Sequence, residues 1–356
     1  MLVIAVHGGA GTHSINKDAE ILIRKGLKEA CAFGQRSFQA NQDACQAIRD
    51  SIVAMEDNHH FNAGTGSNLT IAGTVECDAS IMNSAEDFGA IGATSGIKNP
   101  IKAAYRILVE SQRTDPHGRI PPMLVSGNTP SDLAVDPSEM ITHKARSEWE
   151  RWRAVIQTEQ QSNEITCDTI VQDTVGAIIS TIDGEVSAGV SSGGILLKPT
   201  GRIGEAACFG AGCWASAARG SLNAVACSIS GAGEMVMRAF LAKELADSVR
   251  RPDCDVHEEI ERILNRFIDM CTQRGATRME LLGFRSRICN VNRQLTEVRH
   301  TEKVKSGFGK TRNLYYITAS RLGVYYVHIF TSIQLSTVDP IQQPDCSKIP
   351  NKFLVM

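Results

Sequence analysis

The sequence lacks the features that mark a membrane protein or a nucleic-acid-binding protein. Its formal net charge is −2 over 356 residues, which gives no overall attraction to a polyanion or to an acidic lipid surface. No apolar run approaches the ~20 residues that a transmembrane helix needs. The apolar stretch at residues 2–6 is too short for the core of a signal peptide. We therefore expect neither nucleic acid nor a membrane among the partners of this chain.

The sequence also lacks the usual spacings of metal and dinucleotide sites. Its 11 cysteines are scattered, and none forms a Cys-x-x-Cys pair. Cys208 and Cys213 lie in a glycine-rich segment without nearby histidines, which argues against a zinc site. No Gly-x-Gly-x-x-Gly run follows a predicted strand with an acidic residue downstream, which disfavours a dinucleotide fold. The thiols are expected to be reduced, as in the nucleus or the cytoplasm.

The apolar pattern predicts an α/β protein whose strands gather at the start of the chain and again after residue 174. Short apolar runs predict strands, and apolar positions three or four residues apart predict helices. The strands are expected at residues 2–6, 88–94, 175–181, 186–191 and 224–230, with a hairpin over 68–82 and one further strand within 315–329. The helices are expected at residues 15–33, 41–57, 99–111, 233–249 and 255–273.

Two parts of this pattern carry specific expectations. Residues 136–172 are polar and rich in Glu, Gln, Arg and Ser, so they are predicted to be a mobile linker or pro-segment, with Trp149 and Trp152 on a short helix. In the helix at 233–249, four apolar side chains are expected to form a core face. They are Met235, Met237, Phe240 and Leu241.

Asp173 and Thr174 stand between this polar stretch and an apolar strand. A chain cut at this bond would begin with Thr174, which then carries a hydroxyl nucleophile and a free α-amine with a reference pKa of about 7.7–8.0. The amine can act as the base for the hydroxyl, so no Ser-His-Asp triad is needed. An Asp-Thr pair before a strand is ordinary by itself, and the dipeptide alone is weak support for catalysis.

Five clusters of small residues stand at the ends of predicted strands and strengthen that interpretation. Glycine lets a backbone approach a ligand closely, and backbone N–H groups are what an oxyanion hole needs. One such cluster is typical of a tight turn, whereas five together with Thr174 and Arg202 favour a site. The clusters are HGGAG at 7–11, NAGTG at 62–66, SSGG at 191–194, GAG at 210–212 and SGAG at 230–233.

Several of these segments resemble the N-terminal-nucleophile asparaginase family, which includes plant-type asparaginases, isoaspartyl peptidases, glycosylasparaginases and threonine aspartase (taspase). The resemblance covers residues 1–135 and 170–275. The family-wide segments are HGGAG at 7–11, FNAG at 61–64, DASIM at 78–82, DTVGA at 173–177 and GRIG at 201–204. The segments that resemble the taspase branch in particular are GSNL at 66–69, ECDASIM at 76–82, SGIKNP at 95–100, GRIPP at 118–122, VSSGG at 190–194 and CWA at 213–215.

The resemblance implies a fold and a maturation step. It implies a four-layer αββα sandwich and a single catalytic domain over residues 1–356. That domain would cut itself into an alpha chain of residues 1–173, with a pro-segment at about 136–173, and a beta chain of residues 174–356. It also implies a threonine endopeptidase that cleaves protein substrates after aspartate.

The resemblance further assigns roles around the nucleophile. It implies that Thr174 is the nucleophile in self-cleavage and turnover, and that Ser192 hydrogen-bonds it in place of the second threonine of the family. Ser230 and Gly231 match the oxyanion positions, and Asn62 is expected near the nucleophile.

For substrate binding, the resemblance implies that Arg202 holds the substrate carboxylate, which its planar fork suits. Gly204 and Gly233 are expected beside it. Glu205 replaces the aspartate with which small-substrate members bind a free α-amine. Lys17 matches a lysine near the substrate aspartate, although an exposed helix lysine is the simpler interpretation.

The resemblance also implies partners and an ion. The protein substrates of the taspase branch are a trithorax-type chromatin regulator and the large-subunit precursor of general transcription factor IIA, so the nucleus and the cytoplasm are the expected locations. A homodimer of alpha-beta units is expected. The loop at 55–66 resembles a sodium-binding loop of backbone carbonyls, and no other cofactor is expected.

The tail from about residue 277 departs from the family pattern, because residues 287–312 are basic and unpatterned. A sheet without its C-terminal strands would keep unpaired edges. Two alternative functions therefore stay open. One is an asparaginase or isoaspartyl dipeptidase that acts on small amides, and the other is an inactive variant that does not mature.

Overall fold

The computed structural model describes residues 2–9, 17–127, 132–159 and 174–274, together with five short strands of the tail. In the first half these residues form the elements β1 Val3–His7, α1 Lys17–Asn41, α2 Ala44–Glu56, β2 Cys77–Met82, β3 Phe88–Thr94, α3 Pro100–Ser111, β4 Leu124–Ser126, η1 Pro137–Met140 and α4 His143–Glu159. The second half continues with β5 Val175–Ser180, β6 Val186–Ser192, η2 Glu205–Ala207, β7 Cys213–Ser216, β8 Val225–Ser230, α5 Gly233–Ala239, α6 Leu241–Val249 and α7 Val256–Gln273. The tail strands are β9 Val304–Lys305, β10 Thr311–Arg312, β11 Tyr316–Ala319, β12 Tyr325–Thr331 and β13 Leu354–Val355.

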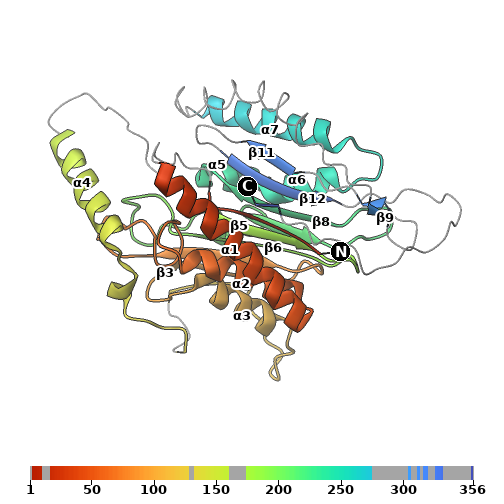
Figure 1. The fold of residues 1–356 in the computed structure, drawn as a ribbon, viewed down its shortest axis with the longest axis horizontal. Coiled ribbons are helices and arrows are strands. Elements are labelled where there is room, and N and C mark those ends of the chain that lie inside the picture. Colours follow the sequence, from red (N-terminus) through yellow and green to blue (C-terminus); the bar gives the residue numbers. More distant parts are fainter. Residues whose placement is uncertain are drawn as a thin grey trace, which may run out of the picture.

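Two sheets pack face to face with helices on both outer sides (Figure 1). The larger sheet has the strand order β13-β1-β5-β6-β2-β3-β4, and the smaller has the order β11-β12-β8-β7. Helices α1, α2 and α3 cover the larger sheet, while α6 lies on β7 and β8 and α7 packs against α6. The expected α/β architecture, a four-layer sandwich, is confirmed.

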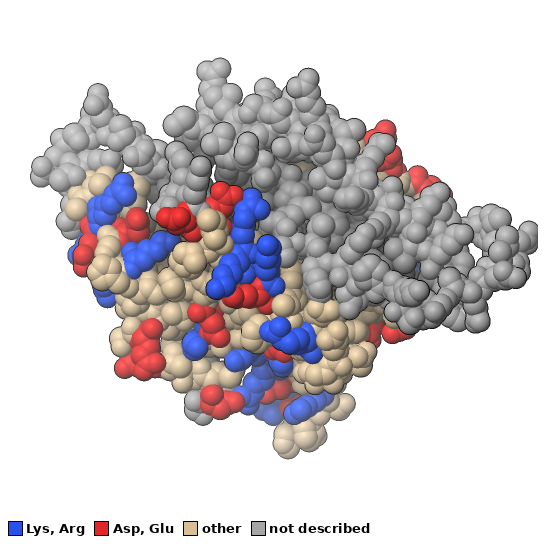
Figure 2. All heavy atoms as spheres, viewed as in Figure 1, with Lys and Arg blue, Asp and Glu red and all other residues tan. Residues whose placement is uncertain are grey.

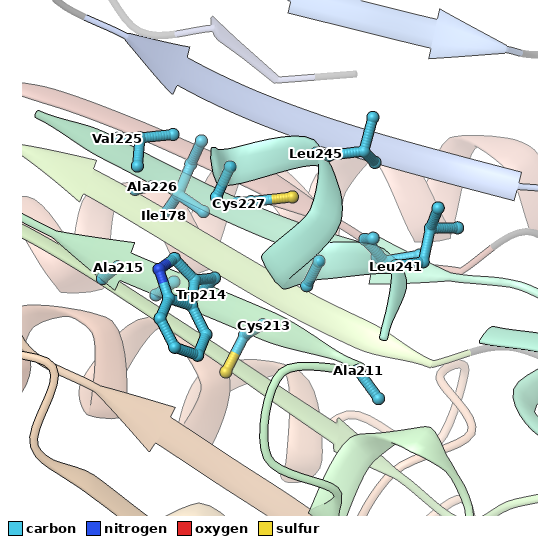
Figure 3. Packing of buried hydrophobic residues seen from close by; sticks show 14 of the residues in the cluster. Ile178, Ala211, Cys213, Trp214, Ala215, Val225, Ala226, Cys227, Leu241 and Leu245 are labelled. Carbon is cyan, nitrogen blue, oxygen red and sulfur yellow. The ribbon is translucent and has the colours of Figure 1, made fainter. Parts of the chain in front are cut away.

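The side chains of β5 alternate in direction, so this one strand packs into two hydrophobic cores. Val175, Ala177 and Ile179 pack against the helices that cover the larger sheet. Ile178 points the other way, toward Trp214, Val225 and the helices beyond (Figure 3). Because successive side chains of a strand point to opposite faces, the even positions of β5 face the second sheet.

Gly176 sets how closely the sheets approach near the start of β5. A Cβ atom at this position would overlap Ser228 Oγ and His7 Nε2. Those two atoms lie 2.8 Å apart in a buried hydrogen bond between the sheets. A glycine is therefore needed at residue 176 if β1 and β8 are to keep this contact.

On the face shown in Figure 2, basic and acidic side chains intermingle over the described residues. Several charged side chains pair on or beside the helices that cover the larger sheet. Examples are Arg24 with Glu20 at 2.8 Å and Arg106 with Asp132 at 2.7 Å. None of the described helices has the length and apolar character needed to cross a bilayer.

Several elements differ from those predicted. The short helix expected to carry Trp149 and Trp152 is present as α4, where Trp149 packs on Leu69 and Val75 and its Nε1 donates to Thr70 O at 2.9 Å. Residues 160–172 of the predicted pro-segment lie outside the described residues. The predicted hairpin at 68–82 is reduced to a bridge between Leu69 and Val75.

The helix predicted at 233–249 is broken in two at Phe240, whose φ of 47° is left-handed. Phe240 is 59% exposed and so is not part of the core, whereas Leu241 is 1% exposed. Met235 and Met237 are partly buried against the core.

The tail takes part in both sheets. β12 pairs with β8 over six residue pairs and β11 pairs with β12, while β13 pairs with β1. The strand expected within 315–329 is present, as β11 and most of β12, so the sheet that contains β8 keeps strands from the tail. The basic segment at 287–312 lies outside the described residues except for β9 and β10, which pair only with each other.

We predict that deleting residues 275–356 lowers the melting temperature by more than about 5 °C and promotes aggregation, because β8 and β1 would each lose a neighbour and expose an edge. The measurement is calorimetry combined with light scattering. A chain ending after Thr331 keeps β11 and β12, so its melting temperature should fall less. Equal melting temperatures for all three chains would show that the tail does not stabilise the sheets.

Candidate active site

Thr174 lies directly before β5, between the two sheets. Its even position gives it the same direction as Gly176 and Ile178, toward the second sheet. Its side chain is 4% exposed. The nucleophile candidate is therefore a buried hydroxyl at the edge of the inter-sheet core.

Three elements contact Thr174. Its Oγ1 lies 2.6 Å from Glu205 Oε1 in η2 and 3.1 Å from Ser192 Oγ at the end of β6. Its N–H donates to Ser230 Oγ, at the end of β8, over 3.3 Å. Residues far apart in the sequence thus meet around one threonine, and their catalytic roles stay predictions.

Glu205 is a buried carboxyl in this group. Burial raises its pKa above the ordinary value, while the hydrogen bond from Thr174 and the positive charge of Arg202 oppose the shift. A Cβ atom at Gly233, the first residue of α5, would overlap Glu205 Oε2. The glycine predicted near the substrate therefore makes room for the Glu205 carboxyl.

The loop that carries Arg202 and Glu205 is fastened to β2 and the residues before it. Gly201 N donates to Glu76 Oε2, and Gly204 N donates to Asp78 Oδ2, each over 2.8 Å. Asp78 is fully buried and its other oxygen accepts from Ala93 N at 2.7 Å. These carboxylates fix the backbone around Arg202, because each accepts an amide that the loop would otherwise leave unpaired.

Arg202 is ion-paired with a residue of α5. Its guanidinium lies 2.9 Å from Glu234 Oε1 in α5, and its side chain is 13% exposed compared with 58% for Glu234. The guanidinium also borders Gly194, Gly204 and Gly233. A planar cation at this edge is suited to bind a substrate carboxylate, which would compete with Glu234 for it.

Asn62 supports the turn that follows Ser192 rather than Thr174 itself. Its Nδ2 donates to Gly194 O at 2.9 Å, and its backbone O accepts from Gly193 N at 2.8 Å. Gly194 N in turn donates to Ser192 Oγ at 3.0 Å. Asn62 thus fixes the position of Ser192, one step from the nucleophile.

The structure describes less of the surroundings of three other predicted site residues. Gly231 directly follows Ser230 at the end of β8. Lys17 begins α1, but its side chain is not among the described ones. Asp173 lies outside the described residues.

No role was predicted from the sequence for Glu56, Glu76, Asp78 or Glu234. Glu76 and Asp78 had a visible signal, since they are acidic residues within an otherwise apolar strand pattern. Glu56 is fully buried at the end of α2, and its Oε1 accepts from Ser191 Oγ at 2.6 Å and from Ile101 N at 3.0 Å. Burial raises the pKa of Glu56 to about 8, so this carboxyl is mostly protonated at neutral pH.

Within the described part of the chain, no group of three or more His, Cys, Asp or Glu residues could hold a metal ion. The loop at 55–66 offers backbone oxygens instead. A Cβ atom at Gly66 would overlap Phe61 O and lie 3.0 Å from His59 O. Backbone oxygens are ligands suited to a hard cation.

Comparison with known proteins places this architecture and site in a family. A family model described as asparaginase matches residues 1–306. The plant-type L-asparaginase of Thermococcus kodakarensis is 36% identical over 265 residues, covering 70% of this chain and 80% of the relative. The isoaspartyl peptidase/L-asparaginase of Xenopus laevis is 33% identical over 249 residues, covering 68% and 74%. That of Mus musculus is 32% identical over 250 residues, covering 68% and 71%.

The chain belongs to the asparaginase family of N-terminal-nucleophile hydrolases. The family resemblance inferred from the sequence is confirmed. The relatives carry names that correspond to the alternative function, an amidase of small aspartyl substrates. The taspase branch in particular is not among these names.

We predict that Glu56→Gln stabilises the protein at alkaline pH by on the order of 2–4 kcal/mol. The folded-state pKa of about 8 lies above the ordinary 4.5, so the wild-type free energy of unfolding should fall as pH rises between these values. The amide keeps an oxygen for Ser191 and does not titrate, so the variant should lack that slope. Urea unfolding between pH 5 and 9 measures the free energy of unfolding of the wild type and of the variant. If the two free energies changed with pH in parallel, the prediction would be contradicted.

Proposed function

We propose that this chain is a self-cleaving threonine hydrolase that attacks carbonyl carbons of aspartyl units. The observation that carries the proposal is the buried Thr174, whose hydroxyl contacts Glu205 and Ser192 and whose N–H contacts Ser230. Membership of an N-terminal-nucleophile family supports the same chemistry. In self-cleavage, Thr174 Oγ1 attacks the Asp173 carbonyl carbon and the acyl group moves from N to O, which breaks the C–N bond and frees the amine. Water then hydrolyses the ester to the Asp173 acid and the Thr174 hydroxyl.

The released α-amine gives the mature site its base. It lies on the same residue as the hydroxyl, and its ordinary pKa of about 7.7–8.0 leaves part of it neutral near physiological pH. In turnover it takes the hydroxyl proton while Thr174 attacks a substrate carbonyl. Arg202 orients the substrate through its carboxylate, with Glu234 as the competing anion.

The first candidate substrate is a peptide bond that follows an aspartate. It is supported by Glu205, which is bonded to Thr174 and stands where small-substrate members bind a free amine. An internal peptide bond presents no free amine, so Glu205 would not have to bind one. Ser192 in place of a second threonine agrees with the same branch.

The second candidate is a small aspartyl amide, such as asparagine or an isoaspartyl dipeptide. It is supported by the names of the relatives compared above, which are a plant-type L-asparaginase and two isoaspartyl peptidase/L-asparaginases. The two candidates share the nucleophile and the carboxylate-binding arginine. They differ in whether the site must accept chain on both sides of the scissile bond.

Several further expectations belong to this proposal. Under the first candidate, the protein substrates are those of the taspase branch, a trithorax-type chromatin regulator and the transcription factor IIA large-subunit precursor, met in the nucleus or the cytoplasm. A homodimer of alpha-beta units is also proposed. The carbonyl oxygens of the loop at 55–66 would hold a structural sodium ion, whose contribution is to fix the turn that carries Asn62.

The self-cleavage prediction is specific to one bond. The purified protein should separate into two chains on a denaturing gel, and the chain of residues 174–356 should have an N-terminal sequence that begins Thr-Val-Gly-Ala. Thr174→Ala removes the hydroxyl and should stay full length. Thr174→Ser keeps a hydroxyl and should cleave, at a lower rate. A different N-terminus in an active preparation would refute the nucleophile assignment.

The substrate prediction concerns Arg202. Arg202→Ala should reduce kcat/KM for an Asp-containing peptide by at least about 30-fold, which corresponds to ~2 kcal/mol or more for loss of a charge-assisted pair. Arg202→Lys should also be poor, because lysine lacks the planar fork. The assay compares peptide cleavage with ammonia release from asparagine and with isoaspartyl dipeptide hydrolysis, in the same preparation. Activity on the small amides alone would select the second candidate.

A further inference from the structure

Before cleavage, Thr174 cannot supply its own base. Its nitrogen belongs to the peptide bond with Asp173, and its N–H donates to Ser230 Oγ at 3.3 Å. An amide nitrogen has no available lone pair, so it cannot accept the hydroxyl proton. The first turnover of this site, the cutting of its own chain, therefore needs a different base from all later ones.

One carboxylate is placed for that task. Among the described residues that contact Thr174 Oγ1, Glu205 is the one that carries a carboxylate, and the two oxygens are 2.6 Å apart. Ser192 Oγ is farther away at 3.1 Å and already accepts from Gly194 N. A threonine hydroxyl has a single proton and an ionised carboxylate only accepts, so the proton of Oγ1 points to Glu205 Oε1.

We propose that Glu205 is the general base of self-cleavage, which deepens the self-cleaving function proposed above and rests on it. Glu205 Oε1 takes the proton from Thr174 Oγ1 as that oxygen bonds to the Asp173 carbonyl carbon. The C–N bond then breaks, and the proton passes from Glu205 to the leaving nitrogen of Thr174. The carboxylate is regenerated, an ester links Asp173 to Oγ1, and water hydrolyses that ester.

The surroundings of Glu205 agree with this role. Burial raises its pKa and makes the carboxylate a stronger base, which is the direction that general-base catalysis near neutral pH requires. The charged and titratable groups around it are Arg202, whose charge favours the ionised form, and Asp78, whose charge opposes it. Glu234 neutralises part of Arg202, and Cys208 at the end of η2 has a pKa of about 11, so it stays protonated.

The test follows self-cleavage of the full chain from the end of its synthesis in a cell-free translation reaction. Samples at timed intervals between pH 4 and 9 are resolved on a denaturing gel. For the wild type, the rate should rise with pH to a plateau, with a midpoint above the ordinary carboxyl pKa. Glu205→Gln keeps the shape and an accepting oxygen but not the base, so it should cleave at least about 100-fold more slowly and without that rise.

Two variants separate a base from a merely structural carboxyl. Glu205→Asp retains a carboxylate at a greater distance and should cleave at an intermediate rate with the pH rise preserved. Glu86→Gln is the matched control. Glu86 Oε1 also accepts a hydrogen bond from a hydroxyl group, that of Ser216, over 2.6 Å, and this contact is far from Thr174. It should cleave at the wild-type rate. Circular dichroism melting of each variant reports on its folding.

The outcomes distinguish this inference from the proposed function. If the wild type stays intact, or Thr174→Ala still splits, the self-cleaving function itself fails, and the role of Glu205 fails with it. If the wild type splits and Thr174→Ala does not, while Glu205→Gln splits at the wild-type rate, only the base assignment is overturned. A wild-type rate that is flat from pH 4 to 9 would overturn it as well, whatever the stability of the variants.

Discussion

The hydrogen bond between Thr174 Oγ1 and Glu205 Oε1 joins the start of β5 to the loop that carries Arg202. It buries a hydroxyl and a carboxyl together at the edge of the inter-sheet core, where each satisfies the other. The rest of the site depends on this contact being held. Asp78 fixes the loop from one side, and Ser192 fixes the hydroxyl from the other.

The two-sheet architecture brings residues from both sheets into contact with Thr174, which a single sheet would not do. β6 belongs to the larger sheet and β8 to the smaller, yet Ser192 and Ser230 at their ends both contact Thr174. Gly176 lets the sheets come close enough for this, beside the contact between His7 and Ser228. Since β12 is the neighbour of β8, the C-terminal tail supports the site indirectly, through the sheet that places Ser230.

The sequence predicted those elements that depend on local signals. The hairpin of β5 and β6 and the helix after Asn99-Pro100 were confirmed, because turn residues and periodicity are local. The break at Phe240 and the docking of Trp149 on Thr70 O were not foreseen, because distant contacts create them. The same limit applies to the site. Motifs indicated Thr174, Ser192 and Arg202, whereas the contact of Glu205 with the nucleophile appears only when residues 31 positions apart are brought together.

In the proposed function, Thr174 acts through its hydroxyl and, once free, its amine. An aspartyl peptide ending in an α,β-epoxyketone tests both groups at once, because ring closure to a six-membered adduct uses the hydroxyl and the amine of one N-terminal threonine. After incubation with the purified protein, peptide mass spectrometry locates the adduct. The account predicts one adduct, on the peptide that begins at Thr174, together with loss of activity. An inactivated protein with its adduct on another residue would contradict it.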